Sequence, residues 1–176
     1  MKEIPAVAIS PLPGGVWTMR LAILGGGTIA RLVVEHVRAG RLGAVEVIAV
    51  SGRSAHSRGA RLAAEFGLRY VVGGDALLAL RPDAVLEAAS HEAVRAHLVA
   101  LLGAGISVVV LSAGALADDA LRAASERAAE SSGALLYVPS GGIGGLDALK
   151  GACVAGVDEV SIRVAKPPAA WKGIPY

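Results

Sequence analysis

Short apolar runs alternate with longer amphipathic stretches along most of the chain. Each run consists mainly of Val, Leu, Ile and Ala, and turns rich in glycine, serine or proline follow most of them. Continuous runs of this kind are typical of strands that are buried on both faces of a parallel sheet. The predicted strands span residues 21–24, 44–50, 67–72, 84–90, 106–111 and 134–138.

The intervals between these runs predict helices, because apolar residues recur in them at helical spacing. The expected helices span residues 28–39, 55–66, 76–80, 91–102 and 118–132, and a further helix begins near residue 145. Strand and helix therefore alternate until six strands are complete. This order predicts an α/β fold with a doubly wound parallel sheet.

The first run leads directly into a glycine-rich turn. Gly25, Gly27 and Ala30 match the G-x-G-x-x-A fingerprint of dinucleotide-binding Rossmann domains. Glycine permits the tight turn and the approach of a pyrophosphate, while the start of the helix offers N–H groups and a positive dipole end. We therefore expect Gly25, Gly27, Thr28 and Ile29 to bind a cofactor. A merely structural turn is the alternative, since the chain has 23 glycines.

The tip of the second run departs from the usual fingerprint. An Asp or Glu that binds the ribose 2′-hydroxyl is expected there, but this chain has Ser51, Gly52, Arg53 and Ser54, and Glu46 comes too early. A hydroxyl and a guanidinium suit a 2′-phosphate. Ser51, Gly52 and Arg53 are therefore predicted to contact the cofactor, which is NAD or NADP. Alternatively, Ser54 caps the next helix and Arg53 is only solvated.

Small residues close the fourth and fifth runs and let a ligand approach the carboxyl ends of the strands. Ala89 and Ser90 follow the fourth run, and Ser112 and Ala113 follow the fifth. These four residues are predicted to lie against the nicotinamide half of the cofactor. Ser90 is also expected to cap the helix that follows it.

Other polar residues have ordinary structural explanations. His91 and His97 lie on a predicted helix and are expected to be surface or packing residues. Asp118 and Asp119 come early in another helix, where acidic side chains favour the dipole, so no metal site is expected. No catalytic residue is assigned.

Composition narrows the class of protein. The chain is 54% hydrophobic and 3% aromatic, so its core must consist of aliphatic side chains. A net charge of +2 without a basic cluster argues against a nucleic-acid partner. No apolar run approaches the ~20 residues of a membrane span. The single cysteine, Cys153, excludes an internal disulfide and favours a cytoplasmic location.

Three segments of the chain resemble L-aspartate dehydrogenases: residues 87–90, 110–116 and 139–149, with further similarity at residues 166–173. The resemblance covers residues 19–176. It implies an NAD(P)-linked oxidoreductase that interconverts aspartate with iminoaspartate, or with oxaloacetate plus ammonia, and often feeds NAD biosynthesis. It also implies a homo-oligomer and places Gly142 against the cofactor.

The family continues with an Asn-rich segment and an acid/base histidine, which this chain lacks before Tyr176. We therefore expect a flexible arm at 1–18, a dinucleotide-binding domain at 19–140, and at 141–176 the incomplete start of a substrate and dimerisation domain, with a strand at 158–165. Such a chain should bind cofactor but oxidise little aspartate. The alternatives are a catalytically incomplete NAD(P)-binding module and another imine or amino-acid oxidoreductase of the homoserine dehydrogenase-like type.

Overall fold

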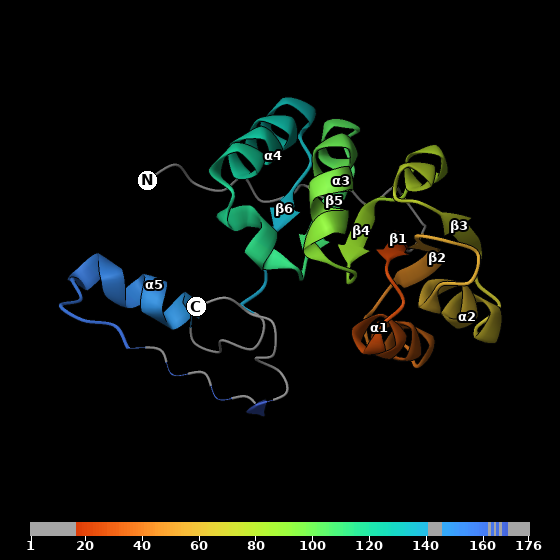
Figure 1. Cartoon of the computed structure of the whole chain (residues 1–176), viewed down its shortest axis with the longest axis horizontal. Helices are drawn as coiled ribbons and strands as arrows, with labels where there is room; N and C mark the ends of the chain where they lie inside the picture. Colours follow the sequence, from red (N-terminus) through yellow and green to blue (C-terminus); the bar gives the residue numbers. More distant parts are fainter. Residues whose placement is uncertain (1–16, 141–145, 162, 164, 166, 169–176) are drawn as a thin grey trace. The chain divides into compact units, whose positions relative to one another are not determined.

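The computed structural model of the chain describes residues 17–140, 146–161, 163, 165, 167 and 168. The chain divides into two compact units, Met1–Pro139 and Ser140–Tyr176. The first unit contains a six-stranded sheet flanked by helices, and the described part of the second contains helix α5 (Leu146–Ala155) (Figure 1).

The sheet is parallel throughout, with the strand order β3-β2-β1-β4-β5-β6. The strands are β1 (Met19–Leu24), β2 (Val45–Gly52), β3 (Tyr70–Val72), β4 (Ala84–Glu87), β5 (Ser107–Val110) and β6 (Leu136–Tyr137). The predicted α/β fold with a doubly wound parallel sheet is confirmed. The register pairs Leu24 with Glu87 and Glu87 with Val110, so β1, β4 and β5 end level with one another.

Helices cover both faces of this sheet (Figure 1). The α-helices of the first unit are α1 (Thr28–Arg38), α2 (Arg58–Glu65), α3 (His91–Gly103) and α4 (Asp119–Ser132), and the short 3₁₀ helices are η1 (Asp75–Leu80) and η2 (Ala113–Ala117). α1 and α2 lie on one face, and α3 and α4 lie on the other. Within the described residues, no helix is long and apolar enough to cross a membrane.

The two faces of the sheet form two separate cores. In β1, Leu21 and Ile23 pack with α1 and α2, whereas Ala22 and Leu24 pack with α3. Successive side chains of a strand point to opposite faces, so a strand covered on both faces is apolar at most positions. Each buried Val, Leu or Ile side chain contributes about 1.5–3 kcal/mol. This explains why the strands read as continuous apolar runs.

The second helix begins later than the sequence indicates. It was expected to span residues 55–66, with a Ser54 cap as one of two alternatives, but α2 begins at Arg58. Its cap is Ser57, whose Oγ accepts from the Ala60 N–H. The Tyr70 hydroxyl explains the difference. It lies 2.7 Å from Ser57 Oγ and donates to the Ser54 carbonyl at 2.6 Å, which holds residues 54–57 in a turn.

The strand expected at residues 158–165 is not observed. The described residues of this range, 158–161, 163 and 165, have no strand structure. A strand needs a neighbouring strand as its hydrogen-bonding partner. The described part of the second unit contains the helix α5 and no strand. This prediction was therefore wrong for the residues that the structure describes.

The outer surfaces of α1 and α2 are joined by polar contacts. The Arg31 guanidinium donates to the Glu65 carboxylate, with one N–O distance of 2.6 Å. Arg31 and Arg38 also lie over the ring of Phe66, at 5.4 and 5.1 Å from its centroid. The hydrogen bond from Arg31 is the main cause that holds the pKa of Glu65 below its usual value.

Candidate functional site

The strand order reverses direction between β1 and β4. From β1 the chain proceeds outward through β2 to β3, and from β4 it proceeds the other way through β5 to β6. The connections on the two sides diverge at such a switch point and leave a crevice at the carboxyl ends of the strands. The turns that follow β1 and β4 border this crevice.

Gly25 lies in a space that admits no side chain. Its φ of +124° suits glycine, and a Cβ at this position would lie 2.3 Å from the carbonyl oxygen of Ala88, which follows β4. Its N–H donates to the Ser51 carbonyl at 2.9 Å. Gly25 therefore brings the ends of β1, β2 and β4 together.

The next two glycines differ in their surroundings. A Cβ on Gly26 would lie 2.2 Å from the backbone nitrogen of Gly59, near the start of α2. A Cβ on Gly27 would meet no atom of the described residues within 4 Å. Gly27 is the N-cap residue of α1 and makes no side-chain cap, and Thr28 and Ile29 are exposed in the first turn. Among the described residues, open space thus adjoins the positive end of a helix, which fits a pyrophosphate.

The tip of β2 separates into a buried and an exposed part. Ser51 is fully buried, and its hydroxyl donates to the Gly73 carbonyl at 2.7 Å. Gly52 has no room for a side chain, because a Cβ would lie 2.4 Å from Ser57 Oγ. Arg53 and His56 are exposed. The tip therefore presents a guanidinium and an imidazole, and residues 51–58 contain no carboxylate.

Glu87, at the end of β4, is 2% exposed and accepts four hydrogen bonds. Its Oε1 accepts from the backbone N–H groups of Ala89 and Ser90 at 2.8 and 3.1 Å, and from the Ser112 hydroxyl at 2.9 Å. Its Oε2 accepts from the Ser112 N–H at 2.9 Å. One carboxylate thus joins the turn after β4 to the turn after β5.

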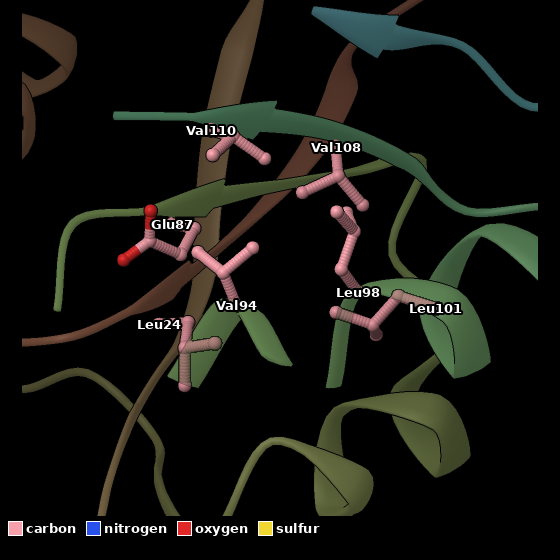
Figure 2. A pocket seen from close by; sticks show the side chains of 7 residues that line it. All are labelled: Leu24, Glu87, Val94, Leu98, Leu101, Val108 and Val110. Atoms are coloured by element: carbon pink, nitrogen blue, oxygen red, sulfur yellow. The ribbon is translucent and has the colours of Figure 1, made fainter. Parts of the chain in front are cut away.

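The other side of Glu87 is apolar. Figure 2 shows its carboxylate turned away from Val94 and Val110, which help to line a small cavity. A buried carboxylate must have hydrogen-bond partners, because leaving it without them is costly. In the described part of the chain these partners are the N–H and O–H groups of the two turns.

Ser90 has a second role in the same turn. Its Oγ accepts from the Ala93 N–H at 3.3 Å and caps α3, as the sequence predicted. The pKa of Glu92 is lowered by a hydrogen bond from its own backbone N–H and then by one from the Ser90 hydroxyl. The Ser90 side chain is therefore engaged at the start of α3.

The two histidines of α3 contact neighbouring turns. The His91 ring lies beside Gly114 in η2, since a Cβ on that glycine would be 2.8 Å from Nε2. His97 Nδ1 lies 2.9 Å from Asp75 Oδ1. The prediction that they are surface or packing residues is consistent with these positions.

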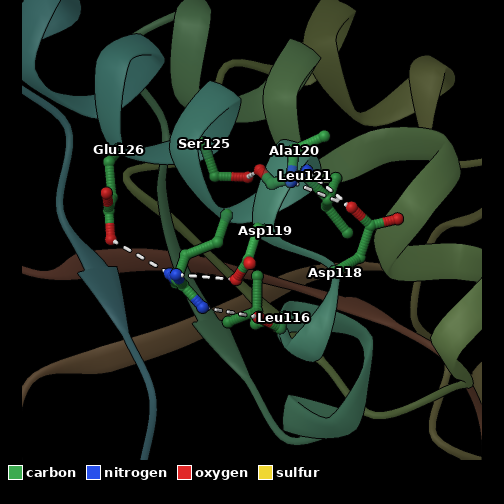
Figure 3. Close-up of polar contacts among 8 residues, drawn as sticks. Leu116, Asp118, Asp119, Ala120, Leu121, Ser125 and Glu126 are labelled. Atoms are coloured by element: carbon green, nitrogen blue, oxygen red, sulfur yellow. Dashed lines mark hydrogen bonds and ion pairs between the residues drawn. The ribbon is translucent and has the colours of Figure 1, made fainter.

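Asp118 and Asp119 act at the start of α4, as expected (Figure 3). Asp118 Oδ1 accepts from the N–H groups of Ala120 and Leu121 at 3.0 and 3.1 Å. Asp119 pairs with Arg122 at 2.8 Å. Capping and a local ion pair therefore account for both carboxylates.

The structure brings several of the predicted cofactor residues to one edge of the sheet. After β1 come Gly25, Gly27, Thr28 and Ile29, and the tip of β2 holds Ser51, Gly52 and Arg53. Ala89 and Ser90 follow β4, and Ser112 and Ala113 follow β5. Gly142 lies outside the described residues. Glu87 was not predicted to have a role, although its position as an acid within an apolar run was a signal for one.

The strand order and the glycine turn at the switch point define a dinucleotide-binding α/β domain. A family model described as "Homoserine dehydrogenase, NAD binding domain" matches residues 25–139. The chain belongs to this family, and its cofactor is NAD or NADP.

Curated relatives and solved structures extend this assignment. The chain is 43% identical over 157 residues to L-aspartate dehydrogenase 2 of Bordetella pertussis. The matched region covers 88% of the chain and 57% of that relative. It is similar to the crystal structure of aspartate dehydrogenase from Thermotoga maritima, with a TM-score of 0.56, 28% identity and coverage of 77% and 51%. Biliverdin reductase from Synechocystis, solved with biliverdin and NADP+, gives a TM-score of 0.62, 27% identity and coverage of 81% and 44%.

Proposed function

We propose that this chain is the cofactor-binding part of an NAD(P)-dependent L-aspartate dehydrogenase. The observation that carries the cofactor site is the space at Gly27, which no described residue fills, beside the start of α1 at the switch point, where Gly27 supplies no side-chain cap. The similarity to L-aspartate dehydrogenases supports the substrate. The chain spans little more than half of the first relative's length.

In this proposal, the two sides of the crevice have different tasks. The turn after β1 holds the pyrophosphate on backbone N–H groups. The turns after β4 and β5 form the floor beside the nicotinamide, which when bound accepts a hydride from the α-carbon of aspartate. The products are iminoaspartate, NAD(P)H and a proton, and water then converts iminoaspartate into oxaloacetate and ammonia.

The tip of β2 favours NADP(H) in this proposal. Arg53 is exposed where an acidic residue would bind the ribose 2′-hydroxyl, and His56 and Arg58 are exposed nearby. A guanidinium can pair with the oxygens of a 2′-phosphate. The proposal also retains the division at residues 140–141 into a cofactor domain and the start of a substrate and dimerisation domain.

The cofactor site is tested by titrating the chain with NADH and NADPH, and by comparing Gly27→Val with Gly103→Val. Both glycines adjoin open space among the described residues, but Gly103 ends α3. We expect Gly27→Val to keep the wild-type Tm and to lose cofactor affinity by about 100-fold or more, because its side chain occupies the space of the phosphate. Wild-type affinity in Gly27→Val would refute the site.

The substrate is tested by reduction of NAD+ and NADP+ in the presence of L-aspartate. The chain is assayed alone and fused to the part of the Bordetella pertussis relative that lies outside the matched region. We expect the fusion to oxidise L-aspartate in preference to L-homoserine. The opposite preference would favour the homoserine dehydrogenase-like alternative.

A further inference from the structure

We propose that Glu87 is a positioning residue for the nicotinamide half of the cofactor. This inference rests on the proposed function, because it requires the nicotinamide to lie over the turns after β4 and β5. Glu87 itself is 2% exposed and is assigned no contact with the cofactor.

The hydrogen bonds of the Glu87 carboxylate all come from these two turns. Three of its four donors are backbone N–H groups, those of Ala89, Ser90 and Ser112. The fourth is the Ser112 hydroxyl. Ser112 is 25 residues away in sequence. The pairing of β4 with β5 brings the two turns near each other, and the carboxylate joins them directly beyond the last paired residues, Glu87 and Val110.

The inward direction of these N–H groups determines what the turns present to the crevice. Ala89 is exposed and Ser112 is half-buried. Their amide protons point at Glu87. The Ser112 carbonyl accepts from the Ala115 N–H in η2 at 3.1 Å, so the carbonyl group and the small side chain of Ala89 remain for a ligand. A surface held in one arrangement before binding loses less freedom when a ligand binds. Glu87 therefore acts on the ligand through the turns.

The pyrophosphate side is held in another way. Gly25 and Gly26 fix the turn after β1 by backbone contacts with Ala88 and Gly59. A change at Glu87 that preserves the fold should therefore weaken binding of the nicotinamide half and spare that of the adenosine diphosphate half. ADP, which lacks the nicotinamide and its ribose, reports the second half alone.

The test measures the affinities of the chain for NADH and ADP in the wild type and in Glu87→Gln. Glutamine has nearly the same shape, but its amide nitrogen donates hydrogen bonds and cannot accept them. The donors that face one of the two carboxylate oxygens in the wild type would therefore face another donor. We expect the Kd for NADH to rise about tenfold or more, with the Kd for ADP within about twofold of wild type. Glu130→Gln, on the exposed surface of α4, is the matched control and should change neither.

A second variant covers the case in which Glu87→Gln does not fold. Ser112→Ala removes the hydroxyl donor but keeps the backbone N–H, so the Kd for NADH should rise about threefold or more, with ADP unchanged. Unchanged NADH affinity in a folded Glu87→Gln, or equal losses for NADH and ADP, would overturn the inference while leaving the proposed cofactor site intact. Failure of the wild type to bind NADH would instead overturn the proposed function, and this inference with it.

Discussion

The turn after β1 and the turns after β4 and β5 border the same crevice but are held by opposite means. The first is fixed by glycines: Gly25 and Gly26 have no room for a Cβ, so backbone packs directly on backbone. The others are fixed by a buried side chain, the Glu87 carboxylate, with four donors around it. One region is specified by the absence of side chains and the other by one long side chain.

This difference determines how each region fails. Adding an atom damages the glycine turn, whereas removing atoms damages the Glu87 network. Arg53, at the tip of β2, and the outer surface of α1 and α2 are exposed and should respond less to substitution. Four variants test this order.

Glu87→Ala should have the largest effect on stability. It leaves three backbone N–H groups without their acceptor and removes a buried side chain from the end of β4. We expect a loss of about 3–5 kcal/mol in the free energy of unfolding, and a fall in Tm of roughly 10 °C. Thermal and urea unfolding measure the loss. Glu130→Ala should leave Tm within about 2 °C of wild type, and an equally small change in Glu87→Ala would contradict the role of the network.

Gly26→Ala should have the next largest effect. Its Cβ would fall 2.2 Å from the Gly59 nitrogen, and since backbone cannot move aside as a side chain can, α2 must shift. We expect a cost of about 1–3 kcal/mol. Gly27→Ala is the matched control, because its Cβ enters open space and should cost less than about 1 kcal/mol. Equal unfolding midpoints for the two variants would show that the contact with α2 is unimportant.

Arg53→Ala should affect cofactor choice and leave stability unchanged. If the guanidinium pairs with the 2′-phosphate, the Kd for NADPH should rise about tenfold, while the Kd for NADH stays within about twofold. Arg127→Ala removes the same charge from the exposed surface of α4 and serves as the control. Calorimetric titration of both variants decides the matter, and a protein that prefers NADH regardless of Arg53 would show that this residue is only solvated.

Glu65→Gln should have the smallest effect, and the effect should depend on pH. The Arg31 hydrogen bond lowers the pKa of Glu65 in the folded chain, so the ion pair stabilises the fold fully above the ordinary Glu pKa of 4.5. This contribution is lost as the pH falls through the lowered, folded pKa. The difference in Tm between wild type and Glu65→Gln should therefore be present at pH 7 and vanish in more acidic buffer. A difference that stayed constant with pH would contradict this assignment.

The parts of the molecule that the sequence made predictable are those with local causes. Apolar runs and glycine stops placed the strands and helices in the right order, and the glycine fingerprint placed the turn after β1. Ser90 was also recognised as a helix cap because capping acts within three residues. These features could be read without knowing which strands are neighbours.

The remaining features depend on contacts between distant residues. Glu87 meets Ser112 only because β4 and β5 pair. Ser57 caps α2 in place of Ser54 because Tyr70, from β3, holds the turn between them. Gly26 has no room for a Cβ because α2 brings Gly59 against it. In each case the deciding partner lies outside the local window.

The contact between Gly26 and Gly59 limits how cofactor preference can be redesigned in this chain. Bulk added at Gly52 would strike Ser57, and bulk added at Gly26 would strike α2. Arg53, Ser54, Ala55 and His56 are exposed, and their side chains can be exchanged without entering either contact. These four positions are therefore the ones to vary in a search for variants that switch between NAD and NADP, while Gly26 and Gly52 should be left unchanged.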